Sequence, residues 1–365
     1  MRFASIVGAR PQFIKLAPLS RALRREHQEI LIHTGQHYDY SMSALFFDEL
    51  EIPVPDYNLE IGSGPHGEQT GRMLAAIEQV LVKERPDWVL VFGDTNSTLA
   101  GALAAAKLHM PIAHVEAGLR SFNRAMPEEI NRVVTDHLAQ RHFCPTETAR
   151  QHLYNEGIRQ GVEMVGDVMY DALLLAWPKL QERATRLLAD WGIAARGDGG
   201  FEPYALVTVH RPVNTDDAAT MADIARALNR LDMPVIFPVH PRTRHLLQRY
   251  DIAWERHIRL VEPQGYLDML ALEHAAFRIL TDSGGVQKEA FLLGVPCITL
   301  REETEWTETV DLGWNTLTGC RMHAILDAVN NRPVPGYPAI NNPFGQGDAA
   351  LRIARSFEGF LPGEI

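Results

Sequence analysis

Short, unbroken apolar segments alternate with longer helical patterns along almost the whole chain, and this alternation constrains the fold more than any other feature. In the first half the segments are "FASIVGA", "EILIHTG", "DWVLVFGD", "PIAHVEAG", "RHFCPT" and "VEMVGD". In the second half they are "YALVTVH", "PVIFPVH", "IRLVEP", "FRILTD" and "VPCITL". A strand that is buried on both faces is apolar throughout, because helices cover both faces of a parallel sheet. The chain therefore predicts an α/β fold built from Rossmann-like parallel sheets.

A long helical pattern followed by a loop rich in glycine divides the chain in two. "DALLLAWPKLQERATRLLADWGI" has helical spacing, and "AARGDGGFEP" after it leads into a fresh strand. We expect an N-terminal domain at 1–170 and a C-terminal domain at 171–345, which suits a length of 365 residues. The segment 346–365 has apolar residues at helical spacing, and it predicts a last helix that packs back on the N-terminal domain.

Composition excludes several classes of protein. A net charge of −11 argues against nucleic-acid binding, which needs a basic surface. No apolar run approaches the ~20 residues of a membrane span, and the N-terminus lacks the apolar core of a signal peptide. The three cysteines have no metal-type spacing, and "FCPT" and "PCITL" look like strands. We therefore expect buried thiols in a reducing compartment, with neither nucleic acid nor membrane as a partner.

Polar residues stand where the apolar strands end, in both halves of the chain. They are Arg10, Asp94, Glu116, His210, His240 and Asp282. One such residue is usually a turn or a helix cap, but the repetition predicts a ligand site, because ligands bind beyond the carboxyl ends of parallel strands. In "TDSGGVQKEA", Ser283 and Gly284 begin a helix, and a helix start can hold a phosphate. A tight turn without a ligand is the alternative there.

Motifs for cofactors and metals are weak or absent. "GSGPHG" at 62–67 matches a dinucleotide-binding pattern, and Asp87 follows about twenty residues later, as that pattern requires. However, "VPDYNLEI" before it is a poor buried strand, and Pro65 lies inside the turn. We expect a surface loop there and no NAD. No Cys/His cluster, Walker motif or nucleophile elbow is present, so we also expect no metal.

A series of short motifs closely resembles the non-hydrolysing UDP-N-acetylglucosamine 2-epimerases. In family order they are "GARPQFIKLAPL", "TGQH", "PDYNL", "FGDTNSTLAGALAA", "HVEAGLRS", "PEEINR", "PTE", "VHRPVN", "TDSGGVQKEA" and "TEWTETV". Each motif is short, but their joint order is highly specific. The resemblance implies a glycosyltransferase-B-like fold, with two domains that face a cleft holding the UDP-sugar. It also implies a homodimeric, cytoplasmic isomerase that needs neither NAD nor a metal.

Inverting C2 of an N-acetylhexosamine requires removal of a proton that no neighbouring carbonyl acidifies. One route oxidises a nearby carbon and needs nicotinamide. The other expels UDP from C1 to give 2-acetamidoglucal, which takes UDP back. That route needs carboxylates at the sugar and cations or donors at the diphosphate. By resemblance the sugar-facing acids are Asp94, Glu116 and Glu128. The alternatives are a helix cap for Asp94 and a structural ion pair for Glu128, and Glu129 is the weaker choice beside Glu128.

The resemblance also assigns residues to UDP. His210 is a catalytic candidate that meets the phosphates, and Glu289 accepts from the ribose hydroxyls unless it merely lies on a solvated helix face. The remaining UDP-binding candidates are Arg10, Lys15, Arg211, His240, Ser283 and Gly284.

Three departures from the common bacterial pattern bear on substrate and regulation. "HRPVN" replaces "HRREN", and "TEWTE", with Trp306, replaces "TERPE". The second change is typical of a branch that includes epimerases of UDP-2,3-diacetamido-glucuronic acid. We favour UDP-GlcNAc, because an acidic sugar would want an extra cation and the change removes one. "QHYDYSM", with Tyr38 and Asp39, departs from the stretch that binds an activating UDP-GlcNAc, which predicts a reverse reaction without added UDP-GlcNAc.

Three other functions stay open. A glycosyltransferase of the same fold would use "DSGGVQKEAFLLGVP" equally well, although it would not need three acids at the sugar. A dehydrogenase or redox epimerase would use 62–67, and a non-catalytic UDP-sugar sensor would not need the acids.

Overall fold

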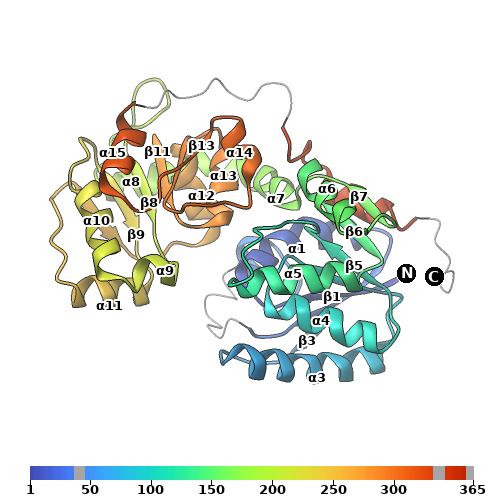
Figure 1. The fold of residues 1–365 in the computed structure, drawn as a ribbon. Coiled ribbons are helices and arrows are strands. Elements are labelled where there is room, and N and C mark those ends of the chain that lie inside the picture. Colours follow the sequence, from blue (N-terminus) through green and yellow to red (C-terminus); the bar gives the residue numbers. More distant parts are fainter. Residues whose placement is uncertain (37–45, 332–341, 359–365) are drawn as a thin grey trace. The chain divides into compact units, whose positions relative to one another are not determined.

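The computed structural model describes residues 1–36, 46–331 and 342–358 (Figure 1). Tyr38 and Asp39, on which the prediction about activation rests, lie outside the described residues. The chain divides into two compact units, one of Met1–Leu175 with Asn342–Ile365 and the other of Ala176–Asn341. The boundary between Leu175 and Ala176 lies a few residues past the expected boundary at 170. Helix α7 (Val168–Ala176) begins in the first unit and ends where the second begins.

Unit 1 is built on a parallel sheet whose strand order in the described residues is β3-β2-β1-β4-β5-β6-β7. The strands are β1 (Arg2–Val7), β2 (Gln28–His33), β3 (Tyr57–Asn58), β4 (Trp88–Phe92), β5 (Ile112–Val115), β6 (Arg141–Cys144) and β7 (Val162–Met164). The helices between and after them are α1 (Arg10–Leu23), α3 (His66–Glu84), α4 (Asn96–Lys107), α5 (Pro127–Leu138), α6 (Glu147–Asn155) and α16 (Ala349–Arg355).

Unit 2 repeats this architecture with the order β10-β9-β8-β11-β12-β13. Its strands are β8 (Ala205–Thr208), β9 (Val235–Pro238), β10 (Ile258–Val261), β11 (Arg278–Thr281), β12 (Cys297–Thr299) and β13 (Asn315–Leu317). Its helical segments after α7 are η1 (Trp177–Lys179), α8 (Leu180–Asp190), α9 (Pro212–Thr215), α10 (Ala218–Leu228), α11 (Pro241–Arg249), α12 (Tyr266–Ala275), α13 (Gly284–Leu293), α14 (Thr307–Asp311) and α15 (Met322–Asn331). Both orders begin as a Rossmann sheet does, so the predicted α/β fold with parallel sheets is confirmed.

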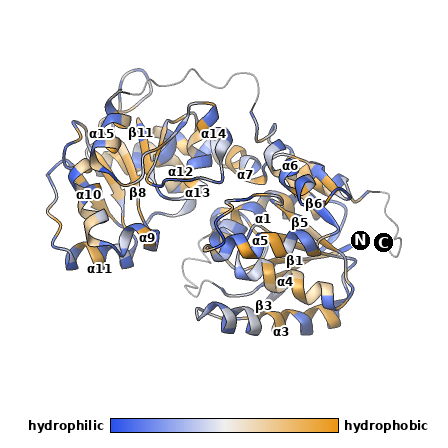
Figure 2. Ribbon diagram, viewed as in Figure 1, coloured by the Kyte–Doolittle hydropathy of each residue, from blue (hydrophilic) through white to orange (hydrophobic). Residues whose placement is uncertain are grey.

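The central strands are mostly apolar because helices bury both of their faces, and Figure 2 shows the hydrophobic residues along them. In unit 1, α4 lies so close to the sheet that a Cβ on Gly101 would lie 2.8 Å from the Ile6 side chain. The alanines of α4 allow this approach, and Ala100, Ala102 and Ala104 are fully buried.

The C-terminal segment belongs to unit 1. Helix α16 packs against α1, and its first two backbone N–H groups, of Ala349 and Ala350, donate to the Asp171 carboxylate over 3.2 and 2.9 Å. Beyond the helix, the Phe357 ring lies 4.8 Å from that of Phe3 and 5.1 Å from that of Trp88. Across the described ranges, no helix combines the length and the apolar character that crossing a membrane requires.

Candidate active site

Asp94 and Glu116 follow two neighbouring strands of unit 1. Strands β4 and β5 pair in parallel, with Phe92 opposite Val115, so their carboxyl ends meet at one edge of the sheet. Glu116 comes directly after β5, and Asp94 is two residues beyond β4. The prediction that both acids stand at strand ends is confirmed.

The position of Glu116 is set by a left-handed backbone conformation and by a buried ion pair. Its φ is +69°, a left-handed conformation that costs a residue with a side chain about 1–3 kcal/mol. Its Oε1 pairs with Lys15 Nζ from α1, and each side chain is 6% exposed. Gly93, with φ +60°, borders this pair, because a Cβ there would lie 2.9 Å from Lys15 Nζ and 3.3 Å from Glu116 Oε1. Lys15, expected at the diphosphate, therefore contacts Glu116, one of the acids expected at the sugar.

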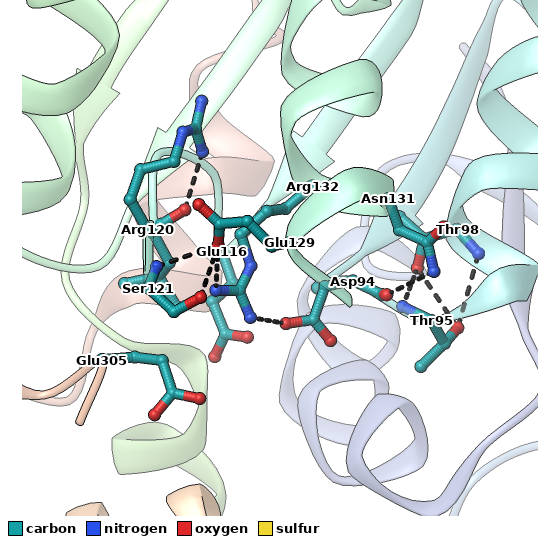
Figure 3. Close-up of polar contacts among 12 residues, drawn as sticks. Asp94, Thr95, Thr98, Glu116, Arg120, Ser121, Glu129, Asn131, Arg132 and Glu305 are labelled. Carbon is teal, nitrogen blue, oxygen red and sulfur yellow. Dashed lines mark hydrogen bonds and ion pairs between the residues drawn. The ribbon is translucent and has the colours of Figure 1, made fainter. Parts of the chain in front are cut away.

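Asp94 has two partners on α5, as Figure 3 shows. Its carboxylate pairs with Arg132, and its carbonyl oxygen accepts from Asn131 Nδ2 over 2.9 Å. The helix cap that was the alternative role for Asp94 is Thr95, whose side chain accepts from the backbone N–H of Thr98. Asp94 therefore does not cap the helix, and its carboxylate forms an ion pair at the strand end.

The adjacent acids of α5 behave differently. Glu129 is buried and accepts from the backbone N–H and hydroxyl of Ser121, both over 2.9 Å, and from Phe122 N over 3.0 Å. Burial acts to raise the pKa of Glu129, but these donors and Arg132 hold it below its ordinary value. Glu128 is exposed in the first turn of α5, and it makes no ion pair within the described residues. Glu129 therefore fastens the loop at 121–122, while Glu128 is accessible.

Arg10 completes the candidates of unit 1. It begins α1 three residues after the end of β1, and its guanidinium lies 5.6 Å from the centre of the Phe46 ring. The strand-end position predicted for Arg10 is confirmed, while its role at the diphosphate stays a prediction.

In unit 2, Asp282 organises the turn that carries His210 and Arg211. Asp282 follows β11 and is fully buried. Its carboxylate accepts from the backbone N–H groups of His210 and Arg211 over 3.1 and 3.0 Å, and from Asn214 Nδ2 over 3.1 Å. His210 Nδ1 lies 3.3 Å from the same carboxylate, while the His210 side chain stays 51% exposed. Asp282 thus fixes one nitrogen of the ring and leaves the rest of the ring open to a ligand.

Ser283 is the N-cap of α13, and Gly284 is its first residue. The N–H of Ser283 donates to Thr281 Oγ1 over 3.0 Å, so strand β11 fixes the turn. A Cβ on Gly284 would lie 3.6 Å from Trp306 Nε1 and 3.8 Å from a Glu305 oxygen, so both side chains border the helix start. The predicted strand-to-helix turn is confirmed, whereas no pattern in the sequence indicates which side chains border it.

Charged side chains surround this turn. Glu305 pairs with Arg301 over 2.9 Å and lies 3.7 Å from Arg211. Burial acts to raise the pKa of Glu305, yet these arginines hold it below its usual range. Lys288 is fully buried with its ammonium 4.2 Å from the centre of the Trp306 ring. The wall beside Gly284 is therefore preorganised by ion pairs and a cation–π contact.

Glu289 is buried on α13, so the alternative of a solvated helix face is wrong. A second carboxyl group, Glu273 of α12, is completely buried and has no hydrogen-bond partner in the described structure. Burial, together with the neighbouring Glu289, raises the pKa of Glu273 well above its usual range. Glu273 is therefore neutral beside Glu289.

His240 stands at the start of α11, where its Nδ1 accepts from the backbone N–H of Arg242 over 3.3 Å. Its side chain is exposed and caps the helix. The stretch 62–67 leads into α3 without a buried strand before it, and Asp87 accepts from Arg2 N over 2.7 Å. Asp87 therefore has a structural partner in β1. Within the described ranges, no group of three or more acids, histidines and cysteines is arranged to hold a metal ion.

Comparisons with known proteins extend the resemblance to nearly the whole chain. The family model described as UDP-N-acetylglucosamine 2-epimerase matches residues 21–358. A Methanococcus maripaludis protein named UDP-N-acetylglucosamine 2-epimerase homolog is 53% identical, over 97% of this chain and 98% of its own length. The UDP-2,3-diacetamido-2,3-dideoxy-D-glucuronate 2-epimerase of Pseudomonas aeruginosa is 47% identical over the same shares of the two chains. The crystal structure of Methanocaldococcus jannaschii UDP-GlcNAc 2-epimerase in complex with UDP-GlcNAc and UDP superposes with a TM-score of 0.88. That chain is 45% identical, and the match covers 98% of this chain and 99% of the other.

Proposed function

Because the chain belongs to the UDP-N-acetylglucosamine 2-epimerase family and is thus an isomerase, we propose that it interconverts UDP-GlcNAc and UDP-ManNAc. The observation that carries the proposal is the pair of acids at adjoining strand ends, Asp94 with Arg132 and Glu116 with Lys15. Two carboxylates fixed beside cations suit proton transfer at a sugar carbon, and they serve no purpose in binding UDP alone.

In the proposed reaction, a carboxylate takes the proton from C2 while the bond between C1 and the UDP oxygen breaks. The products are UDP and 2-acetamidoglucal. The UDP oxygen then attacks C1, and a protonated carboxyl group delivers a proton to the opposite face of C2. Asp94, Glu116 and Glu128 are the acids that we assign to these transfers, with His210 at the departing phosphate.

The phosphate side of the proposal rests on unit 2. The start of α13 at Gly284 offers backbone N–H groups to an anion. Arg211 and His210 stand on the turn that Asp282 holds beside β11. We assign Glu289 to the ribose, and Arg10, Lys15, His240 and Ser283 to the nucleotide, as the family resemblance implies.

The decisive test is incubation with UDP-GlcNAc alone, followed by proton NMR of the anomeric region. UDP-ManNAc should appear, and in D₂O it should carry deuterium at C2, because the returning proton comes from an acid that exchanges with solvent. Full epimerisation with protium kept at C2 would exclude this route and favour the redox route.

Variants separate chemistry from binding. Asp94→Asn, Glu116→Gln and Glu128→Gln should each lower kcat by about 10²-fold or more. The rise in Tm caused by UDP should stay unchanged, because these acids face the sugar. Glu147→Gln is the matched control for Glu128→Gln, because Glu147 is also an exposed glutamate in the first turn of a helix. A control as slow as Glu128→Gln would show that the loss is not chemical.

A second substrate has its own support. The 47% identical relative acts, by its name, on UDP-2,3-diacetamido-2,3-dideoxy-D-glucuronate. Trp306 borders Gly284, where the common family pattern has arginine. Comparing kcat/KM for the two nucleotide sugars decides between them, and we expect UDP-GlcNAc to be preferred.

We further propose a cytoplasmic homodimer. The thiols of Cys144, Cys297 and Cys320 are all free, as in a reducing compartment. Light scattering of the purified protein tests the dimer, and a mass near 40.9 kDa would contradict it.

A further inference from the structure

Two buried histidines lie side by side in the sheet of unit 1. His114 of β5 is paired in register with His142 of β6, and both contact Asp136 of α5. His114 is fully buried, and His142 is 2% exposed. The two histidines share strand position, burial and the neighbour Asp136. A variant of His142 is therefore a matched control for a variant of His114.

Both ring nitrogens of His114 face oxygens that only accept hydrogen bonds. Nδ1 lies 2.7 Å from Asp136 Oδ1, and Nε2 lies 2.7 Å from the carbonyl oxygen of Gly93. A neutral imidazole carries one N–H, so it satisfies one of these oxygens and sets a lone pair against the other. Protons on both nitrogens satisfy both oxygens.

Asp136 is equipped to hold such a cation. Its second oxygen accepts from Arg120 over 2.7 Å and from Gly118 N over 3.2 Å. Burial acts to raise the pKa of Asp136, but the charges of His114 and Arg120 lower it overall. Asp136 is therefore an acceptor toward His114, and the two acceptors at the ring are the geometric reason for a proton on each nitrogen.

His142 shows the opposite arrangement. Its Nε2 lies 2.7 Å from the backbone carbonyl oxygen of Asp136, while its Nδ1 has no partner in the described residues. Burial lowers the pKa of His142, so a single N–H suffices there.

The contacts of His114 and Asp136 reach the two turns that carry the candidate acids. His114 Nε2 donates to Gly93, which precedes Asp94 and borders the Lys15–Glu116 pair. Asp136 accepts from Gly118, which lies on the turn of Glu116. The buried His114–Asp136 pair thus fixes the turns that follow β4 and β5.

We propose that His114 is a positioning residue, a buried imidazolium clamped by Asp136 that sets the Gly93 carbonyl and with it the spacing of Asp94 and Glu116. The proposal deepens the proposed function and rests on it, because those two acids are its proton-transfer groups. His114 touches no substrate itself and acts through Gly93.

The first experiment is ¹⁵N NMR of the protein labelled at histidine, with His114 assigned by its loss in His114→Asn. At pH 7.5 both ring nitrogens of His114 should be protonated, whereas His142 should show one tautomer. In Asp136→Asn, the new amide can donate to Nδ1, so His114 should keep one proton, on Nε2. A single protonated nitrogen in the unmodified protein overturns the proposal. This readout needs no turnover, so it is independent of whether the substrate is UDP-GlcNAc.

The second experiment separates kcat from KM. His114→Asn keeps a donor near Asp136 but removes the one that reaches Gly93, which leaves a buried carbonyl unsatisfied. It should lower kcat roughly 10- to 100-fold with KM within about twofold. His142→Asn is the control, and it should keep kcat while lowering Tm. Equal kcat values for the two variants, in folded protein, would refute the positioning role. No turnover by the unmodified enzyme would instead refute the proposed function.

Discussion

Replacing Gly93 by alanine tests whether the Lys15–Glu116 pair must keep its present position. Gly93 has φ +60°, and a Cβ there would lie 2.9 Å from Lys15 Nζ and 3.3 Å from Glu116 Oε1. The first distance is shorter than real contacts allow, so Lys15 has to move. Since its side chain is flexible, the move is sterically easy, but it pulls the ammonium away from Glu116.

The expected cost has a backbone part and an ion-pair part. A left-handed alanine costs about 1–2 kcal/mol, which corresponds to a Tm decrease of roughly 2–8 °C for a domain of this size. Disturbing a buried pair whose side chains are each 6% exposed adds to that decrease. Because Glu116 then loses its fixed position, kcat should fall at least about tenfold, a barrier increase of roughly 1.4 kcal/mol.

Gly157→Ala supplies the matched control. Gly157 lies in the same unit with φ +87°, and a Cβ there would meet nothing within 4 Å. It therefore carries the backbone cost without the collision. Thermal denaturation and steady-state kinetics should show similar backbone losses, with a larger Tm decrease and the loss of kcat only in Gly93→Ala. If the two variants match in both Tm and kcat, the reasoning about the ion pair is wrong.

Three further predictions concern stability and nucleotide binding. Glu273→Gln should raise Tm more at pH 8 than at pH 5. The folded protein keeps Glu273 protonated at a pH where the unfolded chain releases that proton, which destabilises the fold as pH rises, and glutamine removes this effect. A Tm difference between variant and unmodified protein that does not vary with pH contradicts this. Burial raises the pKa of Asp171 to about 6, so stability should fall by up to about 3 kcal/mol as pH rises from about 4 to 6, and Asp171→Asn should abolish this slope in urea titrations. Asp282→Asn should weaken the Tm increase caused by UDP as much as His210→Ala does, because it loosens the turn of His210. A full increase in His210→Ala would exclude His210 from the UDP site, and a full increase in Asp282→Asn alone would show that the turn does not depend on Asp282.

The sequence predicted most of the strands, including the edge strands β7 ("VEMVGD") and β10 ("IRLVEP"), but it missed the short edge strands β3 and β13. "FASIVGA" and "YALVTVH" became β1 and β8, because a short run that is apolar at every position is typical of a strand covered on both faces. The edge strands β3, "YN", and β13, "NTL", are short and partly polar, so no periodicity identifies them. Pairing with a neighbouring strand, which only the fold supplies, makes these residues strands.

The site was predictable where a residue ends a strand and was not predictable where its partner comes from a helix. Asp94 and Glu116 could be identified because each follows an apolar run. Arg132, which pairs with Asp94, comes from the middle of α5, where a charged residue looks like ordinary helix surface. The family resemblance assigns Lys15 to the diphosphate, and its pairing with Glu116 was not predictable, because sequence spacing does not say which strand end faces α1.

The arrangement of charges explains how an acidic chain can hold a dianionic nucleotide sugar, and it singles out one acid for proton exchange. Glu116 and Asp94 are each paired with a cation, which offsets the cost of burying a carboxylate and limits repulsion of the substrate despite a net charge of −11. Glu128 is exposed and makes no ion pair in the described structure, so of the three acids it is the most open to solvent. We therefore expect Glu128 to return the proton to C2. Glu128→Gln should then eliminate UDP faster than it re-forms UDP-sugar, so free UDP and 2-acetamidoglucal should accumulate in proton NMR spectra. Glu147→Gln should release neither, and slow turnover of Glu128→Gln without glycal would assign the exchanging acid to Asp94 or Glu116 instead.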